Sequence, residues 1–411
     1  MKILIITNGF PPEKKGGTEI YSKTISAGLK DRGHQVSVIA FTEETVSSVE
    51  PVFEDGLEIY KIGKTVGRFN PLNRFRRSYL DRKIDEKISG IINRVNPDII
   101  HVQHLIKLSS GFLKKLNIPH LITLNDFWFI CPLIQLMRAD GKLCDTSNAD
   151  DCMNCIKLRY NLGLTANILN AFGIKEILNR NKYLLGILNK SNILISPSNF
   201  LIEMYRKNGV TNPNLILLRY GIDTERFKEK PKQKKNNLKI GFIGSFMKHK
   251  GPELLINAFK NLRKTHENIE LHLYGYNGGD DSYFKKYART EENGKIFFHG
   301  PVDNKEVPGV LSSLDLLVIP SRWYENSPII IYESYLSKTP FITSDIGGMK
   351  ELAMATGMGV TFKNEDAIDL AEKINDYLEG KINRNYKPEF LNEIDLNKHL
   401  ESLEKIYERI I

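Results

Sequence analysis

The chain alternates short apolar runs with amphipathic segments, and this pattern starts a second time near the middle. In the first half, the runs that predict strands are KILIIT (2–7), QVSVIA (35–40), LEIYKI (57–62), DIIHVQ (98–103), HLITL (120–124) and NILISP (192–197). In the second half they are KIGFIG (239–244), IELHLYG (269–275), KIFFHG (295–300), DLLVIPS (315–321) and PFITSD (340–345). Strands that alternate with helices are typical of parallel sheets with crossover helices. Because 411 residues exceed one ordinary core, we predict two doubly wound α/β domains with a ligand site in the cleft between them.

Helical spacing is found in the segments 18–31, 157–190, 251–264 and 396–411, the last of which predicts a strongly amphipathic helix. The stretch KEKPKQKKNN (228–237) predicts a solvated linker or surface loop. We place an N-terminal domain at 1–217, a second domain at 218–388 and a C-terminal helix at 389–411.

Composition indicates a globular protein, with 41% apolar and 26% charged residues. The formal charge of +9 favours anionic partners such as nucleotides, phosphorylated substrates, acidic membrane surfaces or nucleic acid. The first apolar run ends at Ile6, whereas a signal peptide needs about 7–15 apolar residues. No stretch approaches the roughly 18 uninterrupted apolar residues of a membrane span. We therefore expect a cytoplasmic protein, and any contact with the inner membrane face would be peripheral.

Two common phosphate-binding motifs are incomplete in this chain. A dinucleotide fingerprint needs G-x-G-x-x-G after a strand, but the G-x-G at Gly357–Gly359 has Phe362 in place of the third glycine. The GKT at 63–65 has Glu58 where a P-loop needs its leading glycine. The sequence thus argues against a dinucleotide-dependent dehydrogenase and against a P-loop enzyme.

The stretch WYENSPIIIYES carries two acids, Glu325 and Glu333, around the predicted start of a helix. Pro328 suits the first helical position and Ser327 suits the N-cap. The free N–H groups of such a helix start favour phosphate, and Glu333 lies about 9 Å beyond Ser327 along the helix axis. This spacing suits the two ends of a ligand with a phosphate between them, such as a sugar and a ribose. The alternative is that Glu333 is a solvated helix residue and that Glu325 only caps the helix.

Five stretches in this order resemble the family 4 retaining glycosyltransferases: NGFPPEKKGGTEIYSKTISAGLKDRGHQVSVI, RYGIDTERF (219–227), GFIGSFMKHKG (241–251), WYENSPIIIYES and SDIGGMKEL (344–352). The resemblance implies the GT-B fold, in which two Rossmann-like domains face each other and the C-terminal helix returns to the first. It also implies transfer of a hexose, with retention and without a catalytic metal, from a UDP- or GDP-sugar. The acceptor would be a glycan or a lipid-linked molecule in cell-surface polysaccharide or glycoconjugate synthesis.

The resemblance also implies roles for single residues. Glu325 would lie at the donor sugar, Glu333 would bind the ribose hydroxyls, and Lys250 would bind the diphosphate. The backbone of the remaining donor-binding residues would approach the sugar and phosphates, and these residues are Gly16, Gly17, Gly244, Ser245, Asn326, Ser327, Pro328 and Ile329.

Two positions depart from the family pattern. Ser245 stands where the family usually has an arginine, and Lys248 is a candidate to supply the missing charge. Asn125 stands where the family has a histidine near the reacting sugar, and an amide cannot titrate. His101 and His104 are the nearby candidates for that role, although His101 alternates with apolar neighbours and equally suits a core histidine.

All four cysteines of the chain lie between Cys131 and Cys155, in the order Cys131, Cys144, Cys152 and Cys155. A C-x2-C pair with turn formers before it suits a tetrahedral zinc site. Free or redox-active thiols and disulfides are the alternatives. Similar cysteine-bearing inserts occur among relatives in the family, so we expect a structural clip on the N-terminal domain near the acceptor side.

The segment RFNPLNRFRRSYLDRK (68–83) interleaves six basic residues with aromatic ones. A solvated basic face is one interpretation, and contact with anionic lipid or a lipid-phosphate acceptor is the other. Nucleic acid is disfavoured because no recognition motif accompanies the charge. Two further functions remain open: a nucleotide-sugar epimerase of GT-B fold and a non-catalytic nucleotide- or glycan-binding protein.

Overall fold

A computed structural model describes residues 1–14, 16–46, 49–63, 71–145, 148–160, 170–227, 237–276, 294–382 and 385–411. The chain divides into two compact units, each described by itself: unit 1 comprises Met1–Gly221 with Asn397–Ile411, and unit 2 comprises Ile222–Leu396. Apart from Asn237, the predicted linker at 228–237 lies outside the described residues.

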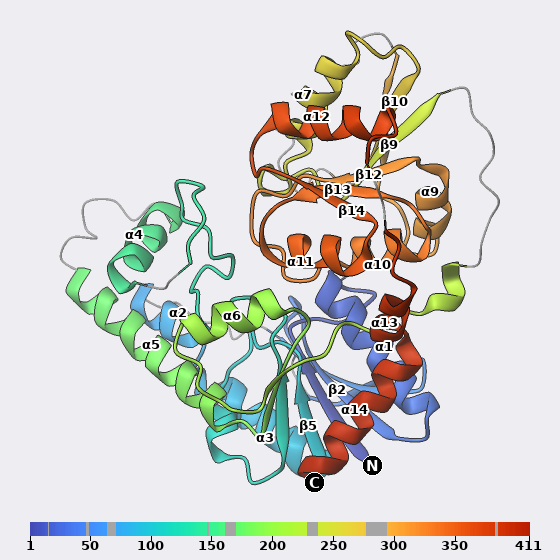
Figure 1. Ribbon diagram of the computed structural model, residues 1–411. Helices are drawn as coiled ribbons and strands as arrows, with labels where there is room; N and C mark the ends of the chain where they lie inside the picture. Colours follow the sequence, from blue (N-terminus) through green and yellow to red (C-terminus); the bar gives the residue numbers. More distant parts are fainter. Residues whose placement is uncertain are drawn as a thin grey trace. The chain divides into compact units, whose positions relative to one another are not determined.

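Unit 1 is built on an eight-stranded sheet in the order β3-β4-β2-β1-β5-β6-β7-β8 (Figure 1). Its strands are β1 (Lys2–Thr7), β2 (Gln35–Phe41), β3 (Pro51–Glu54), β4 (Leu57–Ile62), β5 (Ile99–Val102), β6 (His120–Thr123), β7 (Ile193–Ser196) and β8 (Leu215–Leu217). Every pairing is parallel except that of the edge strand β3 with β4. The central strands β1, β5 and β7 are buried along almost their whole length, as expected for strands covered on both faces.

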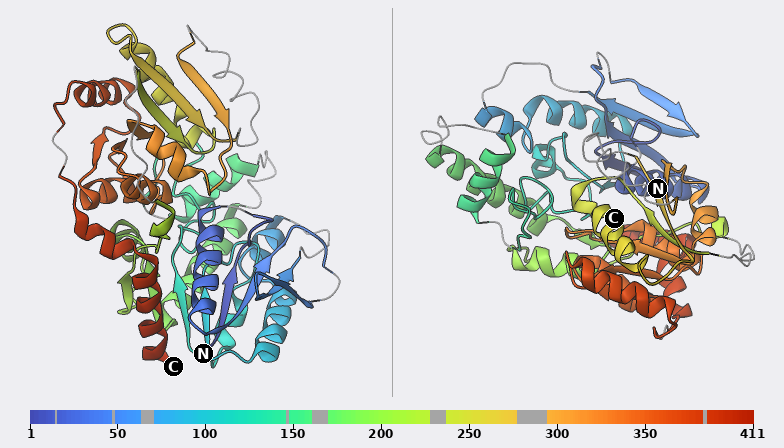
Figure 2. Two further views of the ribbon diagram at one scale, coloured as in Figure 1. Left: turned by 90° about the vertical axis from the view of Figure 1, so that its right-hand side faces the viewer. Right: turned by 90° about the horizontal axis from the view of Figure 1, so that it is seen from above.

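The helices of unit 1 are α1 (Gly17–Asp31), α2 (Pro71–Arg77), α3 (Arg82–Val95), α4 (Ala149–Tyr160), α5 (Asn170–Lys190), α6 (Asn199–Lys207) and α14 (Leu396–Ile410). The final helix α14 lies along α1 (Figure 2). Tyr21 of α1 and His399 of α14 share a hydrogen bond of 2.7 Å, and Arg32 pairs with Glu404 at 2.8 Å. These contacts join segments more than 370 positions apart into one unit.

Unit 2 has a fully parallel six-stranded sheet in the order β11-β10-β9-β12-β13-β14. The strands are β9 (Leu238–Ile243), β10 (Ile269–Tyr274), β11 (Ile296–Gly300), β12 (Leu316–Ile319), β13 (Phe341–Ser344) and β14 (Gly359–Phe362). The helices are α7 (Pro252–Leu262), α9 (Val307–Ser313), α10 (Ile329–Leu336), α11 (Gly347–Thr356), α12 (Ala367–Leu378) and α13 (Leu391–Ile394). Figure 1 shows α7 and α12 on one face of this sheet and α9, α10 and α11 on the other. The two Rossmann-like, parallel-sheet units confirm the predicted fold class.

Every predicted strand is present, whereas the short strands β3, β8 and β14 were not predicted. His101 is fully buried on β5, where its ring nitrogens share hydrogen bonds of 2.7 Å with Tyr407 and with Thr123. Burial lowers the pKa of His101 to about 3. His101 is therefore a neutral core histidine. In the described part of the chain, no helix is both long enough and apolar enough to cross a membrane.

Candidate functional site

Glu325 lies in the loop between β12 and α10, where three side chains donate to one of its oxygens. Lys250 Nζ donates to Glu325 Oε1 across 2.5 Å. The same oxygen accepts hydrogen bonds from Trp323 Nε1 at 2.7 Å and from Ser321 Oγ at 3.1 Å. Burial raises the pKa of the Glu325 carboxyl, but the charge of Lys250 and these hydrogen bonds outweigh it, so the pKa lies below its ordinary value. The protein thus holds Glu325 as an anion.

Lys250 reaches this loop because the turn between β9 and α7 comes close to the end of β12. Gly251 follows with a φ of +66°, and a Cβ atom there would lie 2.1 Å from the carbonyl oxygen of Pro320. Only glycine fits this approach. The predicted donor residues Gly244 and Ser245 lie in the same loop, just after β9. No hydrogen bond joins Ser245 or Lys248 to Glu325 in the described residues, so their contact with phosphate stays a prediction.

Two glycines of α11 shape the backbone after Glu325, and the sequence did not indicate them as site residues. Gly348 N donates to the carbonyl oxygen of Glu325 at 2.8 Å. A Cβ atom on Gly348 would lie 1.7 Å from the carbonyl oxygen of Asn326. Gly347 has a φ of +61°, and a Cβ atom there would lie 2.8 Å from the carbonyl oxygen of Glu325. The segment SDIGGMKEL therefore supports the loop that carries the first acid.

The start of α10 corrects one prediction about Ser327. The helix begins at Ile329, Pro328 is the N-cap residue, and no side chain caps the helix. Ser327 does not cap it because its hydroxyl hydrogen-bonds to the hydroxyl of Tyr332. No side chain therefore accepts a hydrogen bond from the N–H groups of the first turn. Such a helix start can donate to a ligand and is a typical phosphate-binding arrangement.

Glu333 lies within α10 and is only 5% exposed. Among the described residues its carboxyl group has no hydrogen-bond partner. Burial raises the pKa of Glu333 to about 7, although the charge of Arg226 acts in the opposite direction. A buried carboxyl group without a partner costs free energy, which a ligand with hydroxyl donors would recover. We call Lys250, Glu325, the backbone of 326–329 and Glu333 the α10 site.

Gly16 and Gly17, the predicted donor-side glycines of unit 1, lie at the start of α1. Gly16 is the N-cap residue, with an extended backbone and no side-chain cap. A Cβ atom on Gly16 would lie 2.3 Å from Oε2 of Glu19, a buried acid that pairs with Lys14 at 2.5 Å. The observed use of Gly16 is to make room for this carboxylate, and the approach of the donor to Gly16 and Gly17 stays a prediction.

His104 and Asn125 lie at the carboxyl ends of β5 and β6. His104 Nδ1 accepts from the N–H of Ile106 at 3.0 Å, so its proton lies on Nε2, which donates to Asp126 Oδ2 at 2.6 Å. The Asp126 side chain is 28% exposed whereas that of His104 is 6% exposed, so the group that solvent or a ligand reaches is Asp126. Sequence reasoning missed Asp126, although it directly follows Asn125.

Both ends of the Asn125 amide are used inside unit 1. Its Nδ2 donates to the carbonyl oxygen of Gln103 at 2.7 Å, and its Oδ1 accepts from the hydroxyl of Tyr220 at 2.7 Å. The observed role of Asn125, which follows β6, is thus to link Gln103 after β5 to Tyr220. Its predicted contact with the reacting sugar stays untested.

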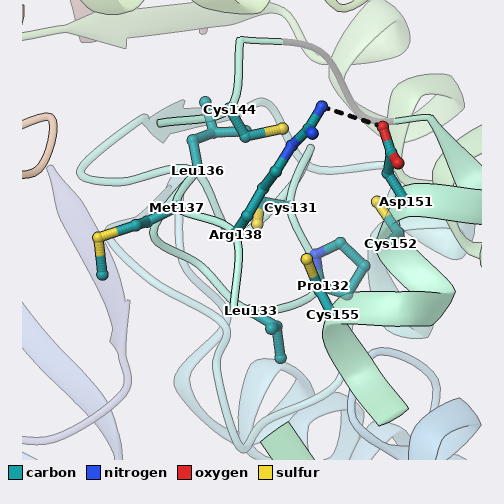
Figure 3. Close-up of a pocket in the computed structure, with 10 residues that line it drawn as sticks. All are labelled: Cys131, Pro132, Leu133, Leu136, Met137, Arg138, Cys144, Asp151, Cys152 and Cys155. Carbon is teal, nitrogen blue, oxygen red and sulfur yellow. Dashed lines mark hydrogen bonds and ion pairs between the residues drawn. The ribbon is translucent and has the colours of Figure 1, made fainter. Parts of the chain in front are cut away.

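The four cysteines line one pocket of unit 1, together with Pro132, Leu133, Leu136, Met137, Arg138 and Asp151 (Figure 3). All four are free thiols. As they are placed, no three or more His, Cys, Asp and Glu side chains of the described residues form a group that could hold a metal ion. We call this site the cysteine pocket.

Comparison with known families covers most of the chain. Residues 15–226 match the family described as Glycosyltransferase Family 4, and residues 223–389 match the family described as Glycosyl transferases group 1. A protein of Klebsiella pneumoniae, described as an uncharacterized 42.6 kDa protein in the cps region, is 22% identical over 367 residues, which are 86% of this chain and 87% of the relative. An uncharacterized glycosyltransferase of Methanocaldococcus jannaschii is 24% identical over 381 residues, or 90% and 87% of the two chains.

Solved structures with the same fold include a complex with UDP and glucose and a glycosyltransferase. Anabaena HepE, in a complex with UDP and glucose, has a TM-score of 0.68 and 16% identity over 99% of both chains. WaaG, involved in lipopolysaccharide biosynthesis, has a TM-score of 0.61 and 15% identity over 99% of both chains. At these identities the likeness shows the fold, which is the GT-B fold that the motifs implied.

Proposed function

The chain belongs to glycosyltransferase family 4, and from this premise we propose that it transfers a hexose with retention from a UDP- or GDP-sugar to a glycan or lipid-linked acceptor. UDP is the preferred base of this proposal because HepE, which shares the fold, was solved with UDP and glucose. Relatives in a cps region and in lipopolysaccharide synthesis support a place in the synthesis of cell-surface polysaccharide.

The α10 site is the observation that carries this proposal. Its three parts are an anionic acid paired with Lys250, a helix start that no side chain caps, and a buried acid without a partner. In this order they match the chemistry of a sugar, a diphosphate and a ribose. Each carboxylate oxygen can accept charge-assisted hydrogen bonds from vicinal hydroxyls.

The chemical demand of the reaction is to stabilise the departing diphosphate. Lys250 and the N–H groups at the start of α10 supply positive charge there without a catalytic metal. We assign Glu325 to the donor sugar and not to a nucleophile, because its Oε1 already accepts three hydrogen bonds. The acceptor would attack from the face of the leaving group, and a phosphate oxygen would help to take its proton.

Thermal unfolding with UDP, GDP, ADP and their sugar conjugates tests this donor site. A ligand at about 100 times its dissociation constant stabilises a protein by roughly 2.7 kcal/mol. We expect a shift with one base only, lost in Glu333→Ala and kept in the exposed control Glu372→Ala of α12. No shift with any nucleotide would contradict the proposal.

A non-catalytic binding protein is the second candidate, because the amide at position 125 is used for internal hydrogen bonds. Nucleotide binding without consumption of the donor, across acceptor extracts, would favour it. Isomerised donor in the absence of acceptor would instead indicate an epimerase.

For the acceptor side, we propose contact with an anionic membrane through α5. Phe172 and Leu178 of this helix are 66% and 55% exposed, and Lys175 and Lys182 lie on the same exposed face. Apolar side chains between lysines suit a surface of anionic lipid. Flotation with phosphatidylglycerol vesicles, but not with phosphatidylcholine vesicles, is expected for the wild type and lost in Phe172→Ser with Leu178→Ser. Ile368→Ser, a control at a residue that is 68% exposed in unit 2, should float like the wild type.

A further inference from the structure

The cysteine pocket joins two segments that are separate in the sequence. Cys131 and Cys144 lie in the irregular chain between β6 and α4, whereas Cys152 and Cys155 lie on α4 itself. Figure 3 shows the four side chains around one space, two from the loop and two from the helix. No other cysteine occurs in the chain, so every thiol of the protein lines this pocket.

The backbone around Cys131 turns two N–H groups toward the sulfur. The N–H groups of Leu133 and Leu136 donate to the Cys131 sulfur. The same turn places Ile134 and Leu136 in the left-handed region, with φ values of 77° and 45°. Such a conformation costs about 1–3 kcal/mol for each residue, and for a β-branched isoleucine it is an outlier. Burial raises the pKa of the Cys131 thiol and raises that of Cys152 to about 12, so a bound metal ion would have to displace the thiol protons.

Two guanidinium groups lie beside the thiols. Arg180 of α5 is 1% exposed, donates to the carbonyl oxygen of Trp128 and to Asn181, and forms no ion pair with any carboxylate of the described residues. Its charge acts on the thiols of Cys131 and Cys152 and on the hydroxyls of Tyr79 and Tyr205. At the rim, Arg138 pairs with Asp151 at 3.1 Å and hydrogen-bonds to Cys144. A buried cation without an anion is unfavourable, so a negatively charged group bound in the pocket would offset the charge of Arg180.

We propose that the cysteine pocket binds one zinc ion through the thiolates of Cys131, Cys144, Cys152 and Cys155. One Zn²⁺ with four thiolates carries a net charge of −2, which Arg180 would offset in part, whereas the charge of Arg138 is already paired with Asp151. Binding releases the four thiol protons to solvent. The thiols as placed do not form a coordination group, so the ion must draw them together. Rotation about a Cα–Cβ bond moves a sulfur by about 3 Å, toward Zn–S distances of about 2.3 Å.

The site would be structural, because all four positions of a tetrahedral zinc would be taken by protein. The apolar core beside α4 is small. Met153 and Ile156 pack with Ile177 of α5 as its three buried residues, and the partly buried residues packed against them are Phe75, Leu133, Ala149, Cys152 and Ile174. A metal ion between the loop and the helix would thus supply cohesion that this small cluster lacks. This inference does not depend on the proposed transfer reaction.

Metal analysis of the wild-type protein, purified without chelators and dialysed, is the direct test. We expect about one equivalent of zinc per chain and four thiols that react with a thiol reagent only after the metal is removed. Addition of Co²⁺ to the zinc-free protein should produce thiolate-to-cobalt charge-transfer absorption. Less than about a tenth of an equivalent of zinc together with no cobalt spectrum would overturn the proposal, and so would two disulfides in protein kept under reducing conditions.

Variants then test each part of the site. Cys144→Ser and Cys155→Ser should each bind zinc at least tenfold more weakly, whereas Met137→Leu, which alters another residue of the same pocket, should bind it normally. Arg180→Met should also weaken binding about tenfold, with partial rescue in Arg180→Lys, because the charge would be the lost feature. Equal zinc affinity in Arg180→Met and the wild type would show that the charge of Arg180 does not contribute to zinc binding. Whether the four cysteines bind zinc at all is decided by the metal content of the wild type.

Discussion

Glu325 and Glu333 lie eight positions apart in unit 2, the first partly buried and the second buried, yet the pKa values of their carboxyl groups shift in opposite directions. Glu325 accepts three hydrogen bonds, one of them from Lys250, and its pKa is lowered. Glu333 accepts none from the described residues, and its pKa is raised to about 7. The first acid is held in place by the protein alone. The second lacks its partners until a ligand supplies them.

The difference distinguishes a carboxylate that the protein holds in place before the reaction from one that is ready to bind a ligand. A group that must stabilise charge during a reaction gains from donors that are already in place, since nothing then reorganises at the moment of reaction. A group that recognises a ligand gains from being desolvated and unsatisfied, since the ligand then restores the missing hydrogen bonds. On this view Glu325 serves the reacting sugar, and Glu333 serves the nucleotide.

The largest expected effect is on turnover in Glu325→Ala. The change removes the charge that Lys250 and Trp323 hold at the proposed donor-sugar position, so we expect at least about a 100-fold loss of turnover. Nucleotide affinity should stay within about threefold of the wild type, because Glu333 is untouched. Parallel activity and binding assays, with Glu372→Ala as the exposed control, measure the two effects. A fully active Glu325→Ala variant would contradict the assignment.

The next effect is on stability in Glu333→Gln. The pKa of about 7 lies above the ordinary value of 4.5, so the folded protein holds this proton more tightly than the unfolded chain does. The stabilising contribution of Glu333 is therefore fully present below pH 4.5 and is lost as the pH rises through 7. Removal of the charge should make the variant more stable than the wild type at pH 8 by about 3 kcal/mol.

Urea denaturation of both proteins between pH 5 and pH 8.5 measures this difference. The gap between the two curves should close as the pH falls toward 5. The lowered pKa of Glu325 predicts the opposite dependence, because its contribution is present above its ordinary pKa and is lost as the pH falls. A constant gap between wild type and Glu333→Gln at all pH values would show that Glu333 is not the titrating group.

The sequence predicted the fold well because parallel strands that are buried on both faces are continuous apolar runs, such as 2–7 and 57–62. It failed where that signal is weak. The strand β8 has three residues, and the edge strand β3 contains the exposed Phe53. The segment of β3 does not stand out from a loop by apolar character, and the apolar run at β8, Leu215 to Leu218, is only four residues long.

For the α10 site, the sequence indicated both acids and the helix between them, and the family resemblance supplied Lys250. Contacts with distant residues could not be predicted. Gly348 is needed because its Cβ would collide with the carbonyl oxygen of Asn326. Asn125 is satisfied by Tyr220, which lies 95 positions away. The spacing of residues along the chain cannot predict such contacts, because they form only when the sheets assemble.

The smallest expected effect, and the sharpest test of how Glu325 is held, is that of Trp323→Phe. Phenylalanine keeps an aromatic ring beside Lys250, which lies 5.3 Å from the centroid of the tryptophan ring, but loses the Nε1–H that donates to Glu325 at 2.7 Å. Because Lys250 and Ser321 still donate to the same oxygen, we expect turnover to fall by only about fivefold, or roughly 1 kcal/mol. The acid limb of the pH–activity profile should move upward, since one interaction that lowers the pKa of Glu325 is gone. An unchanged pH profile would mean that Lys250 alone sets the charge of Glu325, whereas a loss as large as that of Glu325→Ala would mean that Trp323 contacts the substrate itself.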